Sequence, residues 1–368
     1  HVFEAWPALP LSVVYADRGG KGASSDSPPF GGDKRGGMTS APSGTIGWQL
    51  IGDVPQRRRG WGTLPLPGWD PSVGWEKDEQ SVSAQVPFDV IPYEVNPEAG
   101  FIATANNKPV QDGQGPFLGV DWVDGYRLTR IAEVLKSRRD WDMRAVQELQ
   151  MDQVSIPWCV LRKTVLALPD SATRRVDLDE AARESLALLA AWDGVVAADS
   201  PAATVFELLV TEMLERIVKA KAPRSADWVL GKRFTPLLSS TFSLRYMGHL
   251  LRLVQEQPEG WFDRSWSEEL VDALATVMER LKQFYGDDTH RWAWGRVRPL
   301  TLTHPVGKRH SLLGRIFNVG PFPWGGDTYT VGQATVYPNA PLGNPGAIAS
   351  LRIVMDVGDW ERTEVALP

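Results

Sequence analysis

The spacing of hydrophobic positions changes twice along the chain, and these changes predict three regions. Near the N-terminus the apolar residues form short runs typical of strands, at 11–15 and 45–51. From about residue 126 they recur every three or four positions, which indicates amphipathic helices. Towards the C-terminus short strand-like runs return, at 297–303, 328–336 and 348–357.

The helical region is predicted by its apolar faces and by signals at its helix ends. We expect helices over 126–137, from about Asp142 to before Pro157, and over 177–191. Ser200-Pro201 is typical of an N-cap followed by proline at the first helical position. The last long helix is expected to begin at the capping-box pair Ser265 and Glu268 and to end at Gly286.

Strands, then helices, then strands favour an α+β fold with a helical excursion inside a layered core. We divide the chain into a β-rich part over 1–120, a helical region over 121–290 and return strands over 291–368. Within the first part, 19–44 is rich in Gly, Ser and Pro. Such a segment buries little apolar surface, so we expect a flexible insertion.

Composition narrows the function classes. Hydrophobic residues make up 43% and charged residues 23%, as in ordinary globular proteins. The net charge of -6 disfavours nucleic acid as a partner, and the absence of an apolar stretch of 18 residues disfavours a membrane span. Cys159 is the only cysteine, which excludes a disulfide scaffold, and its apolar neighbours predict an inert buried thiol. Because residue 1 is His and 352–368 end without a tail, we expect a fragment of a longer chain.

Several chemical motifs are absent or weak. The sequence has no G-x-S-x-G, Walker or H-E-x-x-H pattern. His290, His304 and His310 fit no common zinc spacing, and His304-Pro305 favours a hydrogen-bonded turn. The Trp residues at 61, 69 and 75 have two interpretations. They form platforms for sugars or bases, or they pack into turns of a Pro-rich layer, which we favour.

The most informative stretch runs from Asn96 to Asn107. It contains a segment of small and β-branched residues, at 101–105, which predicts a strand that ends at Asn106-Asn107. An asparagine amide donates hydrogen bonds without carrying a charge, as an oxyanion hole requires. The alternative is a simple turn formed by two asparagines at the end of a strand.

A set of motifs in one fixed order resembles the penicillin amidase family of N-terminal-nucleophile hydrolases. The resemblance extends from about Tyr15 to the C-terminus, leaving out the insertion. Its motifs are Tyr15-Ala-Asp17, Ile46-Gly-Trp48, Gly52 with Pro55 and Arg57, Pro65-x-Pro67-Gly-Trp69, Asn96-Pro97 through Asn106-Asn107, Tyr126-Arg127, Arg130-Ile131, Leu149-Gln150-x-Asp152-x-x-Ser155, Trp192-Asp193-Gly194, Trp292-x-Trp294-Gly295, His304-Pro305, Gly325-Gly326 with Thr330-Val331, and Ser350-x-Arg352 with Asp356.

The resemblance implies a fold, a mechanism and two catalytic residues. The fold is a layered αββα core, incomplete in this chain. A precursor cleaves itself into α and β subunits, and the new N-terminal Ser attacks an amide carbonyl with its own α-amino group as base. Asn106 corresponds to the asparagine that holds the oxyanion, and Arg127 to an arginine that organises the nucleophile and this asparagine.

The resemblance also implies partners and leaves gaps. It implies a small N-acyl substrate of the penicillin, cephalosporin or acyl-homoserine-lactone type, an α subunit from the same precursor, and export to the periplasm or outside the cell. It implies no cofactor for catalysis. Some members bind structural calcium, and Asp112 lies near a ligand position. The nucleophile would lie upstream, so we expect this fragment to be inactive. The alternatives are a Trp-rich carbohydrate-binding or glycoside-cleaving protein and a non-catalytic relative.

Overall fold

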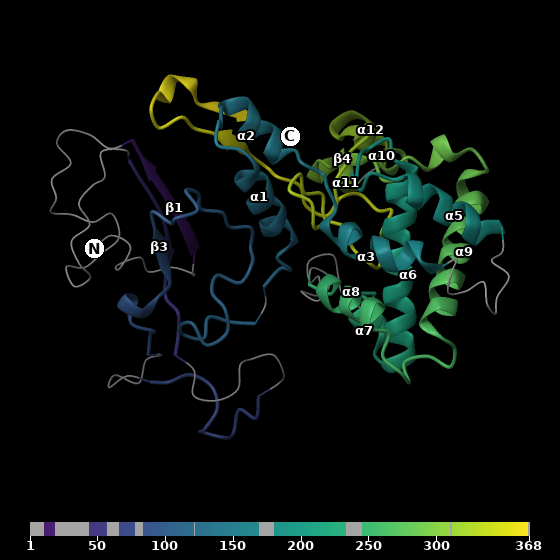
Figure 1. Ribbon diagram of the computed structural model, residues 1–368, viewed down its shortest axis with the longest axis horizontal. Coiled ribbons are helices and arrows are strands. Elements are labelled where there is room, and N and C mark those ends of the chain that lie inside the picture. Colours follow the sequence, from purple (N-terminus) through teal and green to yellow (C-terminus); the bar gives the residue numbers. More distant parts are fainter. Residues whose placement is uncertain are drawn as a thin grey trace. The chain divides into compact units, whose positions relative to one another are not determined.

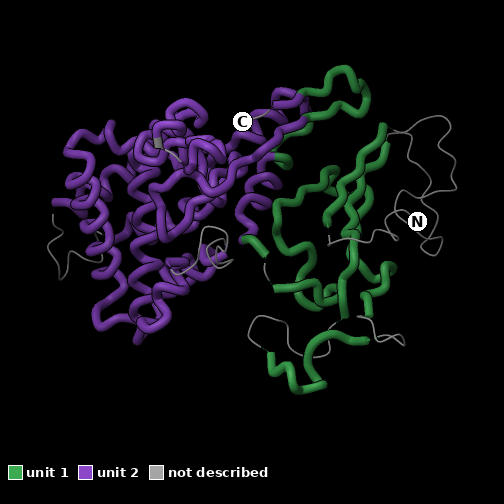
Figure 2. The backbone as a smooth tube through the Cα atoms, turned by 180° about the vertical axis from the view of Figure 1, so that it is seen from behind, with its two compact units in different colours: residues 1–123, 135–139, 354–364 green, residues 124–134, 140–353, 365–368 purple. Residues whose placement is uncertain are grey.

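The computed structural model describes residues 11–18, 44–56, 66–77, 84–120, 122–168, 180–232, 245–309 and 311–366. The chain divides into two compact units (Figure 2). Unit 1 comprises 1–123, 135–139 and 354–364, and unit 2 comprises 124–134, 140–353 and 365–368. Residues 291–353 therefore belong to the same unit as most of the helices. Nearly all of the insertion expected at 19–44 lies outside the described residues, as do Trp61 and His310.

Unit 1 is organised around a three-stranded antiparallel sheet in the order β1 (Leu11–Asp17), β2 (Thr45–Ile51), β3 (Tyr93–Val95) (Figure 1). Both outer strands pair with β2, as the match of Leu11 with Ile51 shows for β1. β2 is almost entirely buried, whereas β1 is mostly exposed. The strands predicted at 11–15 and 45–51 are thus confirmed. β2 carries the continuous apolar residues that a buried central strand needs.

A small apolar cluster supports this sheet, formed by Trp48, Leu50, Val54 and Ile91. Among the described residues, the rest of unit 1 is mostly loops and turns, with the last turn of α1 (Tyr126–Ser137) and the short 3-10 helices η1 (Phe88–Val90) and η4 (Trp360–Arg362). The strand predicted at 101–105 is wrong, because this segment has no regular secondary structure. Its last amide, at Ala105, donates to the Asn107 side chain at 2.9 Å instead of to a neighbouring strand. A local side-chain bond has replaced a sheet ladder.

Unit 2 is helical, with α6 at its centre (Figure 1). Helix α6 is buried along most of its length and contacts α5, α7, α9 and α10, while α3 packs on α5 and α8. Trp158, Trp192 and Phe206 pack ring against ring in this core, with centroids 5.3 to 5.5 Å apart. The described helices are α1 (Tyr126–Ser137), whose last turn belongs to unit 1, α2 (Met143–Gln150), α3 (Ile156–Leu166), α5 (Glu180–Ala191), α6 (Pro201–Lys221), α7 (Ala226–Val229), α8 (Met247–Glu256), α9 (Trp266–Tyr285), α10 (Trp294–Val297), α11 (Pro305–Arg309) and α12 (Ser311–Phe317), with the 3-10 turn η3 (Thr289–Trp292).

The helix ends follow their sequence signals closely. Ser200 accepts from the amide of Ala203 at 3.1 Å, and Ser265 and Glu268 form the complete capping box of α9, which ends at Gly286. The helix predicted from Asp142 is shorter than expected, because α2 ends at Gln150. Pro157 does not stop it but lies in the first turn of α3, where a missing N–H costs nothing.

The return strands are less extensive than predicted. Only Leu300–Leu302 of the first run forms a strand, β4, which pairs with β5 (Val319–Phe322). The run at 328–336 is not a strand. The Asp327 carboxylate accepts from the amides of Tyr329 and Thr330, both at 2.7 Å, and folds this segment into a turn. The third run contains β6 (Arg352–Val354), which pairs with β7 (Glu364–Ala366).

Two predictions about side-chain burial are wrong. Cys159 is exposed, because the neighbouring positions Trp158 and Leu161 take the core-facing side of α3. Trp69 and Trp75 do not pack into turns within unit 1, since they are 88% and 45% exposed. The layered αββα core is not formed by the described residues, whose sheets have three, two and two strands, and it stays a prediction.

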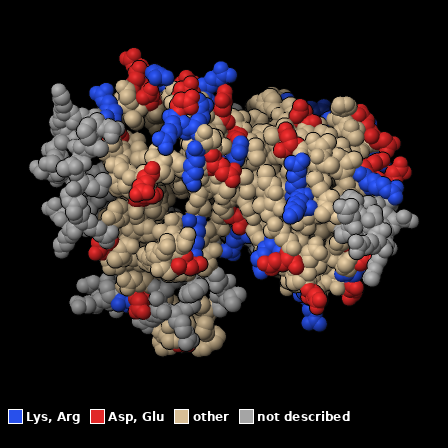
Figure 3. All heavy atoms as spheres, in the orientation of Figure 1, with Lys and Arg blue, Asp and Glu red and all other residues tan. Residues whose placement is uncertain are grey.

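Ion pairs join α6 to α9 on the surface of unit 2. The Arg216 guanidinium binds Glu212 at 2.9 Å, Glu269 at 3.0 Å and Asp272 at 3.1 Å, and Arg280 binds Glu212 at 2.8 Å. On the face of unit 2 seen in Figure 3, acidic and basic side chains are interspersed and form no continuous basic area. No helix in the described ranges is both long and apolar enough to cross a membrane.

The capping box of α9 gives a stability test. Ser265→Ala removes the side-chain acceptor of the Glu268 amide, so we expect a loss of about 1 kcal/mol of unfolding free energy. The measurement is a denaturant or thermal melt of the chain. Ser267→Ala, two residues inside the helix, is the matched control and should be neutral or slightly stabilising. Equal losses from both variants would contradict a specific capping role.

Candidate functional site

Asn106 lies at the end of an irregular segment in unit 1 and has a left-handed backbone, with φ of 61°. Asparagine adopts this conformation more readily than most residues. Its side chain is exposed, and its backbone carbonyl accepts from the amide of Val123 at 3.1 Å. This bond joins the two ends of the loop over 107–122. The residue therefore presents its amide to the surface from a fixed point in the backbone.

The adjacent Asn107 has a different role. Its Oδ1 accepts from the amide of Ala105 at 2.9 Å, and its Nδ2 donates to the carbonyl of Lys108 at 3.0 Å. These bonds form the turn that was the alternative interpretation of the asparagine pair. Asn107 therefore shapes the turn, while the role of Asn106 as an oxyanion donor stays a prediction.

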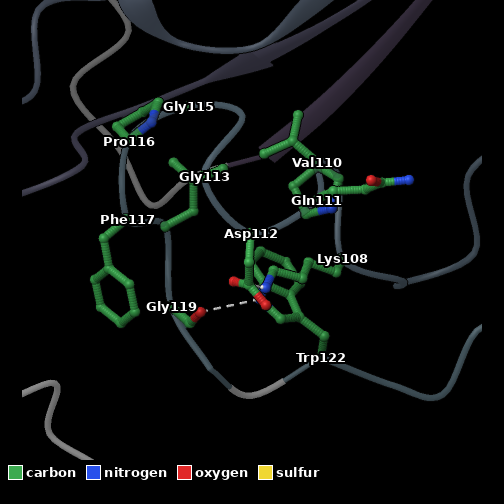
Figure 4. Close-up of a pocket in the computed structure, with 12 residues that line it drawn as sticks. Lys108, Val110, Gln111, Asp112, Gly113, Gly115, Pro116, Phe117, Gly119 and Trp122 are labelled. Atoms are coloured by element: carbon green, nitrogen blue, oxygen red, sulfur yellow. Dashed lines mark hydrogen bonds and ion pairs between the residues drawn. The ribbon is translucent and has the colours of Figure 1, made fainter.

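The loop that follows Asn106 encloses a pocket of about 320 Å³ (Figure 4). Its walls combine apolar side chains such as Phe117 and Trp122 with glycines, and Trp122 Nε1 donates to the carbonyl of Gly119 at 3.1 Å. At one side Lys108 and Asp112 form an ion pair. The volume lies at the lower end of the range for small-molecule sites.

Asp112 was the candidate calcium ligand. Its side chain is 97% exposed and pairs with Lys108, which neutralises its charge. Across the parts of the chain that the structure describes, no group of three His, Cys, Asp or Glu side chains is placed to hold a metal. Asp112 thus lacks companion ligands there, and calcium binding stays a prediction.

Arg127 lies in unit 2, in the first turn of α1, so the two predicted catalytic residues belong to different units. Burial lowers the pKa of Arg127, and the charge of Asp327 partly opposes this. The turn that carries Arg127 is anchored on both sides. The Tyr126 ring meets the ring of Tyr329 edge to face at 5.7 Å, and Arg130 binds the Asp152 carboxylate with contacts of 2.6, 3.0 and 3.1 Å.

The sequence analysis missed a group of buried ionisable residues in unit 2. Glu207, Arg298 and Asp327 are 4%, 1% and 1% exposed. Burial lowers the pKa of Arg298 to about 10, against the opposing charges of the two carboxyl groups. Burial is also the main cause that raises the pKa of Glu207 well above its usual range. The sequence offered one signal for this buried group, which was Asp327 directly after Gly325-Gly326. Glu207 offered no signal, because it lies in an ordinary pattern of helical residues.

The glycines before Asp327 have a structural cause. Gly326 has φ of 80°, and a Cβ there would collide with the carbonyl of Gly332.

His304 also behaves as the sequence suggested. Its Nδ1 accepts from the amide of Val306 at 3.2 Å, and its ring stacks on Phe317. The turn predicted at His304-Pro305 is confirmed.

Comparisons with known proteins agree on one family. Residues 38–368 match the family described as Penicillin amidase. An acyl-homoserine lactone acylase QuiP from Pseudomonas fluorescens (strain Pf-5) is 30% identical, with 81% of this chain and 36% of that protein aligned. The Penicillin acylase 2 proenzyme from Pseudomonas sp. (strain SE83) is 27% identical, over 87% of this chain and 38% of the relative.

Among solved structures, a thermostable penicillin G acylase from Alcaligenes faecalis aligns with a TM-score of 0.45 at 21% identity, over 68% of this chain and 46% of that one. The chain spans between a third and two fifths of the length of the curated relatives described above. Since the family match covers 331 residues of 368, from 38 to 368, the chain belongs to the penicillin amidase family.

Proposed function

We propose that the protein containing this chain hydrolyses N-acyl amides, with an N-terminal Ser nucleophile supplied by a part of the protein outside this chain. The observation that carries the proposal is Asn106, an exposed neutral amide in a left-handed conformation at the end of the family's Asn96–Asn107 motif. Family membership and the names of two relatives, a homoserine-lactone acylase and a penicillin acylase, support the reaction type.

The chemistry needs a donor that carries no charge of its own. The serine oxygen attacks the amide carbonyl, its proton passes to the free α-amino group of the same residue, and negative charge develops on the carbonyl oxygen. Asn106 Nδ2 donates a hydrogen bond to this oxyanion. A neutral donor stabilises the developing charge without attracting a carboxylate product strongly, and a pre-set position avoids reorganisation during the reaction. Collapse of the intermediate expels the amine, and water then releases the acid.

Arg127 completes this part of the proposed mechanism as a positioning residue. Its guanidinium offers several donors in a rigid planar arrangement, which suits it to hold the serine and the asparagine in place. The anchors at Tyr126 and Arg130 keep its turn of α1 fixed within unit 2. A partly desolvated cation at this place also favours negative charge on the substrate oxygen.

The remaining features of the proposal concern the whole protein. Its substrates are acyl-homoserine lactones or acylated β-lactams, its α subunit comes from the same precursor by self-cleavage, and it acts in the periplasm or outside the cell. Catalysis needs no cofactor, and calcium bound with the help of Asp112 has a structural role. The proposal also implies that the present chain by itself is inactive, because the proposed serine nucleophile belongs to another part of the protein.

The first prediction concerns the Asn106 amide in the full-length protein. Asn106→Gly keeps the left-handed backbone but removes the donor, so kcat for an N-acyl substrate should fall about 10²–10³-fold. Asn106→Asp should be at least as harmful, because a carboxylate accepts where a donor is needed. Initial-rate kinetics measure both effects.

A matched control for Asn106→Asp lies in the same unit. Asn96 also has a positive φ, of 45°, but its Oδ1 accepts from the amide of Ile46 at 2.9 Å. Asp provides the same acceptor, so Asn96→Asp should leave kcat nearly unchanged. If Asn106→Gly retains full activity, Asn106 has no part in the mechanism.

The second prediction concerns Arg127. Arg127→Lys keeps the charge but loses the planar set of donors, so kcat should fall about 10- to 150-fold, as expected for one charge-assisted hydrogen bond of about 1.5–3 kcal/mol. KM should change less than kcat. Arg144→Lys, in the exposed ion pair with Glu148 of α2, is the control and should leave kcat nearly unchanged. A larger loss of kcat from the control than from Arg127→Lys would contradict the role of Arg127.

A further inference from the structure

A buried polar cluster in unit 2 combines three ionisable side chains from different elements. Glu207 comes from the middle of α6, Arg298 directly follows α10, and Asp327 lies in the turn after Gly326. All three are at least nine-tenths buried, with exposures of 4%, 1% and 1%. The Ala334 carbonyl accepts from Arg298 at 3.2 Å, the Ala334 amide donates to the Asp327 carbonyl at 2.8 Å, and α10 contacts α6, so the three elements meet in the interior of unit 2.

Arg298 uses only part of its hydrogen-bonding capacity. Its Nη2 donates to the carbonyls of Ala334 at 3.2 Å and Thr335 at 2.6 Å, and its planar group lies 5.0 Å from the centre of the Trp294 ring. Within the described residues, Nε and Nη1 have no protein acceptor. They also form no ion pair with either neighbouring carboxyl group there.

The two carboxyl groups show the same pattern. Asp327 Oδ1 is saturated by the amides of Tyr329 and Thr330, but its Oδ2 has no protein donor among the described residues. Glu207 Oε1 has none in that part of the chain either. Four polar atoms of the cluster, two on Arg298 and one on each carboxyl group, therefore lack a hydrogen-bond partner among the described residues, and burying an unpaired polar atom is unfavourable.

Folded proteins rarely leave such groups unsatisfied, and an internal water molecule with about three hydrogen bonds is their usual partner. Donors from a guanidinium and acceptors from two carboxyl groups suit a molecule that both accepts and donates. A metal cation would be repelled by Arg298 and find only two carboxyl groups, and an anion would be repelled by Asp327. Water is the ligand that fits both sides.

We propose that Glu207, Arg298 and Asp327 enclose an internal water-binding site, in which at least one water molecule accepts from Arg298 Nε or Nη1 and donates to the carboxyl groups. The site lies behind the turn that carries Tyr329, whose ring contacts Tyr126 of α1 at 5.7 Å. It thereby fixes, through this turn, the part of α1 that precedes Arg127.

Protonation completes the hydrogen bonding. Burial first and then the nearby charge of Asp327 raise the pKa of Glu207, and Arg298 opposes them only in part. A proton on Glu207 turns one of its carboxyl oxygens into a donor, which an ionised carboxylate cannot be. Among the described residues, Tyr246 and Tyr329 also interact with this cluster, both with pKa values raised by burial, and the charge of Asp327 acts on Arg127.

The test compares two buried glutamates of the same helix. Glu207→Gln preserves shape, one donor and one acceptor, so the midpoint of thermal unfolding at neutral pH should stay within about 2 °C of the parent chain. Glu212→Gln is the control. This substitution breaks the ion pairs of Glu212 with Arg216 and Arg280, so it should lower the midpoint by more than about 3 °C. Glu207→Leu removes the polar group and leaves Arg298 and Asp327 unsatisfied. It should therefore also lower the midpoint of thermal unfolding.

The pH dependence has a defined sign. The folded-state pKa of Glu207 lies above its unfolded value, so its stabilising contribution is complete below the unfolded pKa and is lost as pH rises through the folded pKa. The stability of Glu207→Gln relative to the parent should therefore increase from pH 5 to pH 8. A constant difference over this range would show that Glu207 carries no extra proton and would overturn that part of the proposal.

A crystal structure of the parent chain decides the water itself. We expect density for a molecule within about 3.2 Å of Arg298 Nε or Nη1 and of a carboxyl oxygen of Glu207 or Asp327. A direct ion pair between Arg298 and Glu207, together with equal losses in Glu207→Gln and Glu212→Gln, would overturn the proposal. None of these measurements depends on catalysis, so the site can be present even if the proposed hydrolysis is not.

Discussion

The burial of α6 is the constraint on which unit 2 depends. A helix surrounded by other helices gains stability from its apolar side chains, but every polar group on it must find a partner inside the protein. Glu212 finds two arginines at the edge of the core, and Thr211 bonds back to the carbonyl of Glu207 at 2.9 Å. Glu207, deeper inside, has Asp327 and Arg298 among its ionisable neighbours from other elements. The turn over 327–336 therefore packs into the helical core of unit 2.

The same requirement explains how the candidate site is built. In unit 1 the irregular backbone around Asn106 is held by local bonds, from Val123 to Asn106 and from Ala105 to Asn107. In unit 2 the turn of Arg127 is held by a ring contact and a carboxylate pair. Each unit thus fixes one proposed catalytic side chain without regular strands. In this arrangement Asn106 is exposed, and burial lowers the pKa of Arg127.

The sequence was most informative where a single local interaction decides the structure. The caps at Ser200 and Ser265 and the stop at Gly286 were predicted because each depends on residues within one helical turn. β2 was predicted because its apolar residues are continuous. Asn106 was selected from the motif order and from the chemistry of its amide, although the strand expected before it is absent. Cys159 and Trp69 were placed wrongly, because an apolar neighbourhood in sequence does not say which side of an element faces the core.

By itself the sequence determined the family, the main helices with most of their ends, and the residue types available for catalysis, since these follow from local pattern and motif order. Only the tertiary structure decided that the run at 328–336 is a turn and that Asn107 is used locally while Asn106 is exposed. It also brought Glu207, Arg298 and Asp327 together. The reason is physical. The protonation and hydrogen bonding of a buried group depend on its neighbours in space. Glu207 and Arg298 are more than 90 positions apart in the chain, so no local sequence pattern encodes their contact.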